Sequence, residues 1–105
     1  MTDAPGLAAT ARQVIEANQY LVLATADRHG VPWASPVWHA HAGYREFFWV
    51  SHPQARHSRN IETRPQVSIV IFDPSVRPGA AQAVYISGVA EMTTVRIPIG
   101  DASAA

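Results

Sequence analysis

The chain has 105 residues, 48% of them hydrophobic and 15% charged, and its formal net charge is zero. This length allows one small domain, the composition is too apolar for a disordered chain, and the balanced charge argues against general attraction to nucleic acids or membranes. Cysteine is absent, which excludes disulfides, thiolate catalysis and cysteine-ligated metal sites. Because the chain has neither a signal-like start nor an apolar run long enough to span a membrane, a cytoplasmic protein is expected.

A helix and a hairpin are predicted in the first part of the chain. After a disordered start over residues 1–6, apolar residues recur at helical spacing, namely Leu7, Ala8, Ala11, Val14 and Ile15. A buried strand is predicted over residues 20–25. Residues 27–30 then form a turn that ends in Gly30, which tolerates positive φ, so a hairpin is expected to lead into a second strand over residues 31–41.

The second predicted strand presents two different faces. One face carries Trp33, Ser35, Val37, His39 and His41, and the other carries Ala34, Pro36, Trp38 and Ala40. Proline cannot donate a hydrogen bond to a central strand, so we expect this strand to lie at a sheet edge, or to bulge, at Pro36. Such a position leaves backbone groups free to meet a ligand.

The remaining predicted elements complete a small antiparallel barrel. In chain order they are a third strand over residues 46–50, a short helix from about Pro53 to Arg64, a fourth strand over 66–72, a loop over 73–79, a fifth strand over 82–92 with a bulge at Gly88, and a strand stub over 95–99. One helix, four or five antiparallel strands and an inserted short helix are typical of such a barrel. The folded domain is therefore expected over residues 7–94, followed by an atypical tail over 95–105.

The junction between the third strand and the short helix predicts an anion site. Ser51 or His52 stands where an N-cap residue is expected, and the start of a helix leaves backbone N–H groups at the positive end of its dipole. Arg56 and Arg59 add guanidinium donors suited to a phosphate. Charge runs are more often solvated helix faces, but the change from strand to helix at this point favours the phosphate interpretation.

Other chemistries receive less support from the sequence. His39 and His41 lie two apart on one strand face, but two imidazoles without a third ligand are insufficient for a catalytic zinc. No metal is therefore predicted, although a histidine-rich metal protein remains one of the alternative hypotheses. The tryptophans are expected in the core or at an interface, and no nucleophile with a base and an orienting group is recognisable.

Four blocks of the sequence resemble the pyridoxamine 5′-phosphate oxidase-like split β-barrel family. They are residues 33–38, 48–51, 55–61 and 84–91, and the resemblance extends over about residues 8–94. It implies a mainly β fold, a small antiparallel split β-barrel with an N-terminal helix and one inserted short helix. Members are typically homodimers that bind FMN, or in some branches a deazaflavin or haem, at the subunit interface. The implied activity is oxidoreduction, with a hydride passing between the cofactor ring and a small molecule.

The resemblance also implies cofactor-binding positions, although no catalytic side chain. The segment Ser35, Pro36, Val37 and Trp38 matches the strand beside the ring and ribityl chain, Val50 and Ser51 match the strand end near the phosphate, and Arg56 and His57 match a basic pair that holds the phosphate. His57 stands where the oxidase usually has lysine, so its charge depends on pH. Gln82 lies one residue from the place of a flavin-binding glutamine.

The end of the chain departs from the family. The oxidase's C-terminal motif, which binds the substrate phosphate, has no counterpart, and residues 95–105 do not resemble the usual ending. The chain is therefore expected to be a shortened member that binds FMN, with a deazaflavin as the alternative and haem less favoured. A non-catalytic dimeric domain with weak or no cofactor binding is the alternative function.

Overall fold

The computed structural model describes residues 4–77 and 82–93 of the chain. The predictions for residues 1–3, for the end of the 73–79 loop and for the tail over 95–105 lie outside the described residues. None of the helices in the described ranges is both long and apolar enough to cross a membrane.

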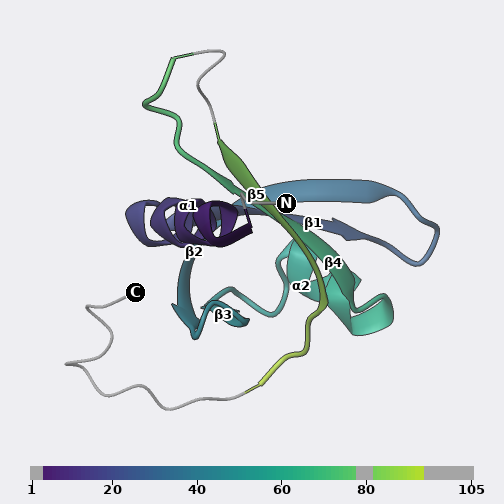
Figure 1. Ribbon diagram of the computed structural model, residues 1–105. Helices are drawn as coiled ribbons and strands as arrows, with labels where there is room; N and C mark the ends of the chain where they lie inside the picture. The colour runs from purple at the N-terminus through teal and green to yellow at the C-terminus, as the bar shows by residue number, and fades with distance from the viewer. Residues whose placement is uncertain (1–3, 78–81, 94–105) are drawn as a thin grey trace.

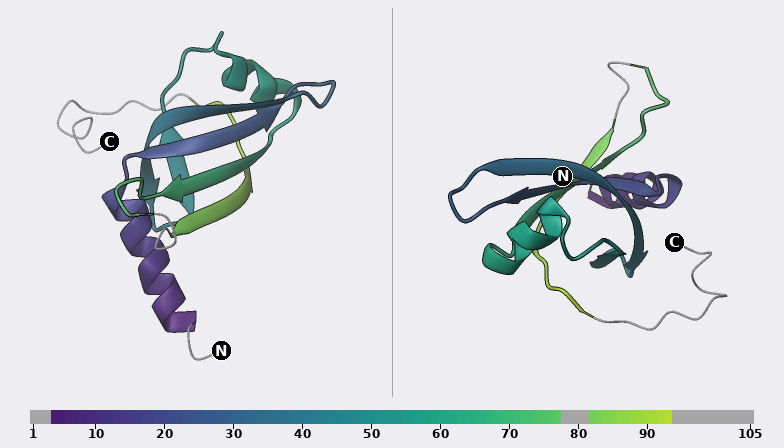
Figure 2. Two further views of the ribbon diagram at one scale, coloured as in Figure 1. Left: turned by 90° about the horizontal axis from the view of Figure 1, so that it is seen from above. Right: turned by 180° about the vertical axis from the view of Figure 1, so that it is seen from behind.

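The fold is a five-stranded antiparallel sheet with two helices (Figure 1). In chain order the elements are α1 (Ala4–Ala17), β1 (Tyr20–Ala26), β2 (Pro32–Ala42), β3 (Glu46–Trp49), α2 (Arg56–Thr63), β4 (Gln66–Phe72) and β5 (Ala83–Val89). The strand order is β3-β2-β1-β4-β5, and the sheet curves into a half-barrel (Figure 2). The predicted mainly β fold, with one N-terminal and one inserted helix, is confirmed.

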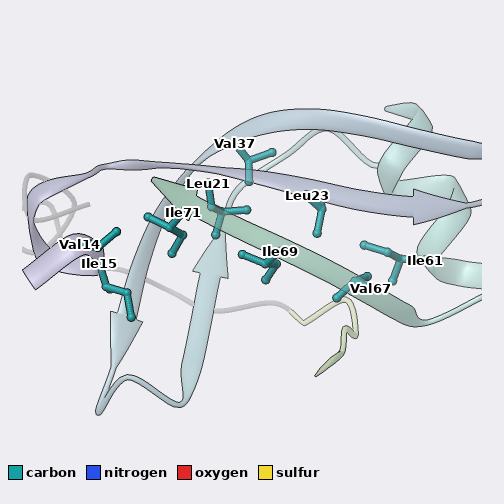
Figure 3. Close-up of a cluster of buried hydrophobic side chains, with 9 residues drawn as sticks. All are labelled: Val14, Ile15, Leu21, Leu23, Val37, Ile61, Val67, Ile69 and Ile71. Carbon is teal, nitrogen blue, oxygen red and sulfur yellow. The ribbon is translucent and has the colours of Figure 1, made fainter. Parts of the chain in front are cut away.

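The hydrophobic core lines the concave face of this sheet. Along β1, buried residues alternate with partly exposed ones, and Leu23 and, on β4, Ile71 are fully buried. Figure 3 shows the whole cluster, which comprises Val14, Ile15, Leu21, Leu23, Val37, Ile61, Val67, Ile69 and Ile71. Burying such aliphatic side chains stabilises the fold by about 1.5–3 kcal/mol each. Both helices contribute to this core, so α2 is held by packing as well as by its polar contacts.

The two helices lie at opposite ends of the sheet (Figure 2). α1 packs on β4 and β5, whereas α2 packs on β1 and β2. The turn between β1 and β2 lies at the α2 end, where the Asp27 carboxylate accepts hydrogen bonds from the backbone N–H groups of His29 and Val31. Gly30 has a φ of +82° in this turn, which explains why glycine is suited to that position.

The edge position of Pro36 is confirmed. β3 pairs with β2 only over residues 39–42, so residues 32–38 of β2 have β1 as a neighbour on one side and no described strand on the other. The N–H of His39 points to β1, because it donates to the carbonyl of Gln19. Backbone groups alternate in direction along a strand, so the missing N–H of Pro36 lies on the open side and costs the sheet no hydrogen bond.

Several predicted boundaries are wrong by a few residues. α2 begins at Arg56 and not at Pro53, because residues 52–55 form a turn in which the Ala55 N–H donates to the carbonyl of His52. The N-cap is therefore Ala55 rather than Ser51 or His52. The third strand ends at Trp49 and the fifth covers Ala83–Val89. No bulge occurs at Gly88, since β4 and β5 pair in unbroken register.

Candidate functional site

Four side-chain contacts hold the first turns of α2, three of them to strand residues and one to the segment that follows β3. The contacts are Arg56 with Trp33, His57 with Ser35, Ser58 with Ser51, and Asn60 with Thr25. Trp33 and Ser35 lie on the same face of β2, because they are two residues apart on a strand. The predicted phosphate-binding pair therefore lies against β2, with Arg56 beside Trp33 and His57 beside Ser35. We call this arrangement the α2 corner.

Arg56 lies against an aromatic ring. Its guanidinium carbon is 4.3 Å from the centroid of the Trp33 ring, within the range of a cation–π contact. Both side chains are exposed. The hydrogen bond from Val31 N–H, and less strongly the one from His29 N–H and the charges of His29 and Arg56, lower the pKa of the neighbouring Asp27. The α2 corner therefore carries an exposed, oriented positive charge.

His57 contributes a neutral ring to the same corner. Its Nδ1 lies 3.1 Å from the Ser35 hydroxyl oxygen, and its Nε2 is enclosed without a hydrogen-bond partner among the described residues. Burial lowers the pKa of His57. The imidazole is therefore uncharged near neutral pH, so the positive charge of the predicted basic pair resides on Arg56.

The N-terminus of α2 lacks a side-chain cap. Ala55 cannot accept a hydrogen bond through its side chain, so the first backbone N–H groups of the helix have no such partner. Ser51 precedes this turn, and its hydroxyl oxygen lies 3.1 Å from that of buried Ser58. Uncapped N–H groups, the helix dipole and Arg56 together make a site that favours an anion.

The other predicted site residues are distributed differently. Val37 is buried in the core, whereas Pro36 and Trp38 point to the outer face, so only backbone groups of this segment face the open edge. By alternation these are the groups of Ala34, Pro36 and Trp38. Val50 is 88% exposed beside the corner.

Gln82 lies at the other end of the sheet. It precedes β5, whose first residue pairs with the last residue of β4, whereas α2 leads into the first residue of β4. Gln82 lines two small hollows beside α1, with volumes of about 160 and 220 Å³. These are smaller than the roughly 300–1,000 Å³ of typical ligand pockets, and the residues of the α2 corner line neither of them.

His39 and His41 form an aromatic cluster and not an exposed pair. His39 is 5% exposed, and its Nε2 donates to the carbonyl of Asn18 over 2.9 Å. The ring of His41 stacks on that of Tyr44, with centroids 4.6 Å apart, and both histidines contact Phe47. In the described ranges, no three histidine, cysteine or carboxylate side chains gather as a metal site would require.

The sequence-based interpretation did not assign a site role to Trp33, Thr25 or Asn60. Asn60 is buried and its amide donates to the Thr25 hydroxyl over 3.0 Å, which ties α2 to β1. The alternation along β2 offered a usable signal for Trp33, because it places Trp33 on the same face as Ser35. The Asn60–Thr25 contact joins residues that are far apart in the sequence. It depends on how α2 packs on the sheet, so no local sequence pattern predicts it.

Comparison with known proteins relates the chain to a family. The sequence profile described as pyridoxamine 5′-phosphate oxidase matches residues 7–97. None of the curated proteins that were compared with the chain matches it.

Similar solved structures include two heme proteins and a reductase. HutZ, the heme storage protein from Vibrio cholerae, is 26% identical with a TM-score of 0.72, and the match covers 88% of this chain and 63% of HutZ. A heme binding protein from Mycobacterium smegmatis is 34% identical with a TM-score of 0.69, over 80% of this chain and 35% of that protein. An F420 reductase is 24% identical with a TM-score of 0.67, over 78% of this chain and 62% of the reductase, and shows a shared fold. The chain thus spans from about a third to less than two thirds of the length of these proteins.

Proposed function

Because the chain belongs to the pyridoxamine 5′-phosphate oxidase family, we propose that it is an oxidoreductase that binds FMN, or a deazaflavin, at the α2 corner. The observation that carries this proposal is the exposed Arg56 guanidinium beside the uncapped start of α2. Those are the donors that a phosphate monoester requires. The substrate would be a small molecule.

The residues of the corner fit such a cofactor. Arg56 would pair with the phosphate, and the first N–H groups of α2 and the Ser51 hydroxyl would donate to its oxygens. The open edge of β2, which no described strand covers, provides backbone groups for a planar, polar ring system. When bound, a flavin supplies the hydride chemistry itself, and the protein holds and orients it. His57, uncharged and bonded to Ser35, would keep the edge and the helix in register.

We propose a homodimer with the cofactor between its subunits. The outer face of the sheet carries exposed large side chains at Tyr20, Trp38, Phe72 and Tyr85. Tyr20 stacks on Trp38, and strand pairing places Val70 directly opposite Tyr85 on the same face. Exposed apolar groups gathered in this way mark interaction surfaces. A second copy would cover this face and could complete a site that one copy leaves open.

Haem binding is the second candidate, and two similar structures are heme proteins. Ring nitrogens of His39, His41 and His57 are enclosed and lack hydrogen-bond partners among the described residues. The other ring nitrogens of His39 and His57 contact Asn18 and Ser35, so either ring would have to turn before it could serve as an axial ligand, which favours the flavin proposal. The absorption spectrum of the purified protein separates the two candidates, since haem gives a Soret band and flavin does not.

Titration of the protein with FMN, followed by flavin fluorescence, tests the main proposal. Arg56→Ala should weaken FMN binding by about 10- to 100-fold, because it removes a charge-assisted contact to the phosphate. Arg45→Ala, which removes an exposed arginine in the turn before β3, should leave the affinity unchanged. Equal affinity of wild type and Arg56→Ala for FMN would contradict the proposed site.

A further inference from the structure

We propose that Trp33 is the positioning residue for Arg56. This inference rests on the proposed phosphate-binding role of Arg56 and extends it to a residue that contacts the cofactor phosphate only through Arg56. Its basis is the position of the Arg56 guanidinium over the face of the Trp33 ring, at 4.3 Å between carbon and centroid.

Trp33 is held on two sides. Its ring lies against Arg56, and its backbone carbonyl accepts a hydrogen bond from the Thr25 hydroxyl over 3.5 Å. The same hydroxyl accepts the amide hydrogen bond of buried Asn60 on α2. A chain of contacts therefore runs from α2 through β1 to β2 and returns to α2 at Arg56. This closed chain fixes the β2 backbone at Trp33, from which the ring projects, relative to the helix that carries the guanidinium.

An aromatic partner suits an anion-binding arginine better than a carboxylate would. A free arginine side chain loses up to about 2 kcal/mol of rotamer entropy when a ligand immobilises it. Contact with an indole face restricts the side chain in advance, but it neither neutralises the charge nor occupies the two donors that grip a phosphate. A carboxylate at the same place would compete with the phosphate for those donors.

The experiment compares FMN with riboflavin, which lacks the phosphate, in binding to wild type and two variants. Trp33→Leu should weaken FMN binding by about 2- to 5-fold, the range that a cation–π contact between exposed side chains supports. Riboflavin binding should stay unchanged, which also shows that the variant is folded. Trp33→Phe, which retains an aromatic face, should restore most of the FMN affinity. In an Arg56→Ala background, Trp33→Leu should have no further effect on FMN.

The outcomes separate this inference from the proposed function. If Arg56→Ala weakens FMN binding and Trp33→Leu does not, the positioning role is wrong and the phosphate site stands. Equal weakening of FMN and riboflavin by Trp33→Leu would mean that the indole acts on the ring or on folding, which also overturns the inference. Wild-type protein that does not bind FMN overturns the proposed function and this inference with it.

Discussion

At the scale of single residues, two histidines, buried His39 and half-buried His57, are held in their neutral form. Burial lowers the pKa of His39, although its hydrogen bond to the Asn18 carbonyl opposes the shift, and burial also lowers the pKa of His57. For His39 the donation from Nε2 to that carbonyl places the proton on Nε2. Both rings therefore act in the fold as uncharged, directional groups at neutral pH.

The lowered pKa values predict a stability that declines in mild acid. Above the ordinary histidine pKa of 6.5, both rings are neutral in the folded and the unfolded chain. As the pH falls below 6.5, the unfolded chain takes up protons that the folded chain resists, so the free energy of unfolding decreases. Urea denaturation should show a falling midpoint between pH 7 and pH 5.5.

Substitution of the histidines checks the cause of this decline. Replacing both in the double variant His39→Gln and His57→Gln should flatten the pH dependence, whatever it does to stability at pH 7. The His29→Gln variant is the control, because His29 is exposed. It shows how the pH dependence of stability changes when a histidine outside the folded interior is replaced. An unchanged slope in the double variant would show that other groups cause the decline.

At the scale of elements, the start of α2 lacks the side-chain cap that would stabilise it. The backbone of Ala55 is extended, with φ −61° and ψ 147°, which is the conformation in which serine or aspartate caps a helix. The sequence places alanine there instead. The helix is held by its contacts to the strands and by Ile61 in the core, so it does not need the cap.

Introducing the cap should therefore separate stability from binding. Ala55→Asp is expected to raise the free energy of unfolding by about 0.5–2 kcal/mol, because its carboxylate accepts from the free N–H groups. The same carboxylate would repel and displace a phosphate, so FMN affinity should fall. Ala55→Ser should give part of the stability with a smaller loss of affinity. A variant that is more stable and binds FMN as well as wild type would place the phosphate away from this helix start.

The elements themselves follow from local patterns, whereas the site depends on tertiary packing. An apolar run locates β1 and a run rich in β-branched residues locates β4, and the position of Pro36 predicts the open edge correctly. The start of α2 was placed too early, because the rule that proline suits a first helical turn did not account for the separate turn at residues 52–55. The distance of Gln82 from α2 follows from hairpin geometry, since two antiparallel neighbours begin at opposite ends of a sheet.

At the scale of the whole molecule, the two faces of the sheet differ in how they are covered. The concave face holds the core and meets both helices, but the outer face leaves aromatic side chains exposed on four strands, with Tyr20 at 61% and Tyr85 at 79%. This pattern could be read only after the strand order was known, because the sequence does not tell which strands are neighbours. The proposed homodimer would cover these side chains.

Disrupting that face should produce a monomer. Tyr20→Arg places a charge among the exposed aromatic side chains and is expected to shift the protein from dimer to monomer in analytical ultracentrifugation. Val31→Arg changes a similarly exposed apolar residue in the turn before β2, away from this face, and should leave the dimer intact. A wild-type protein that sediments as a monomer at micromolar concentration would contradict the proposed dimer.

The partial pairing of β2 with β3 has one more consequence. A strand edge without a partner is where an extended segment of another molecule can add to a sheet and begin aggregation. Proline in the middle of the open stretch removes a donor on that side, so an approaching strand finds an interrupted hydrogen-bonding pattern. Pro36 therefore makes this edge a poor site for the addition of a further strand.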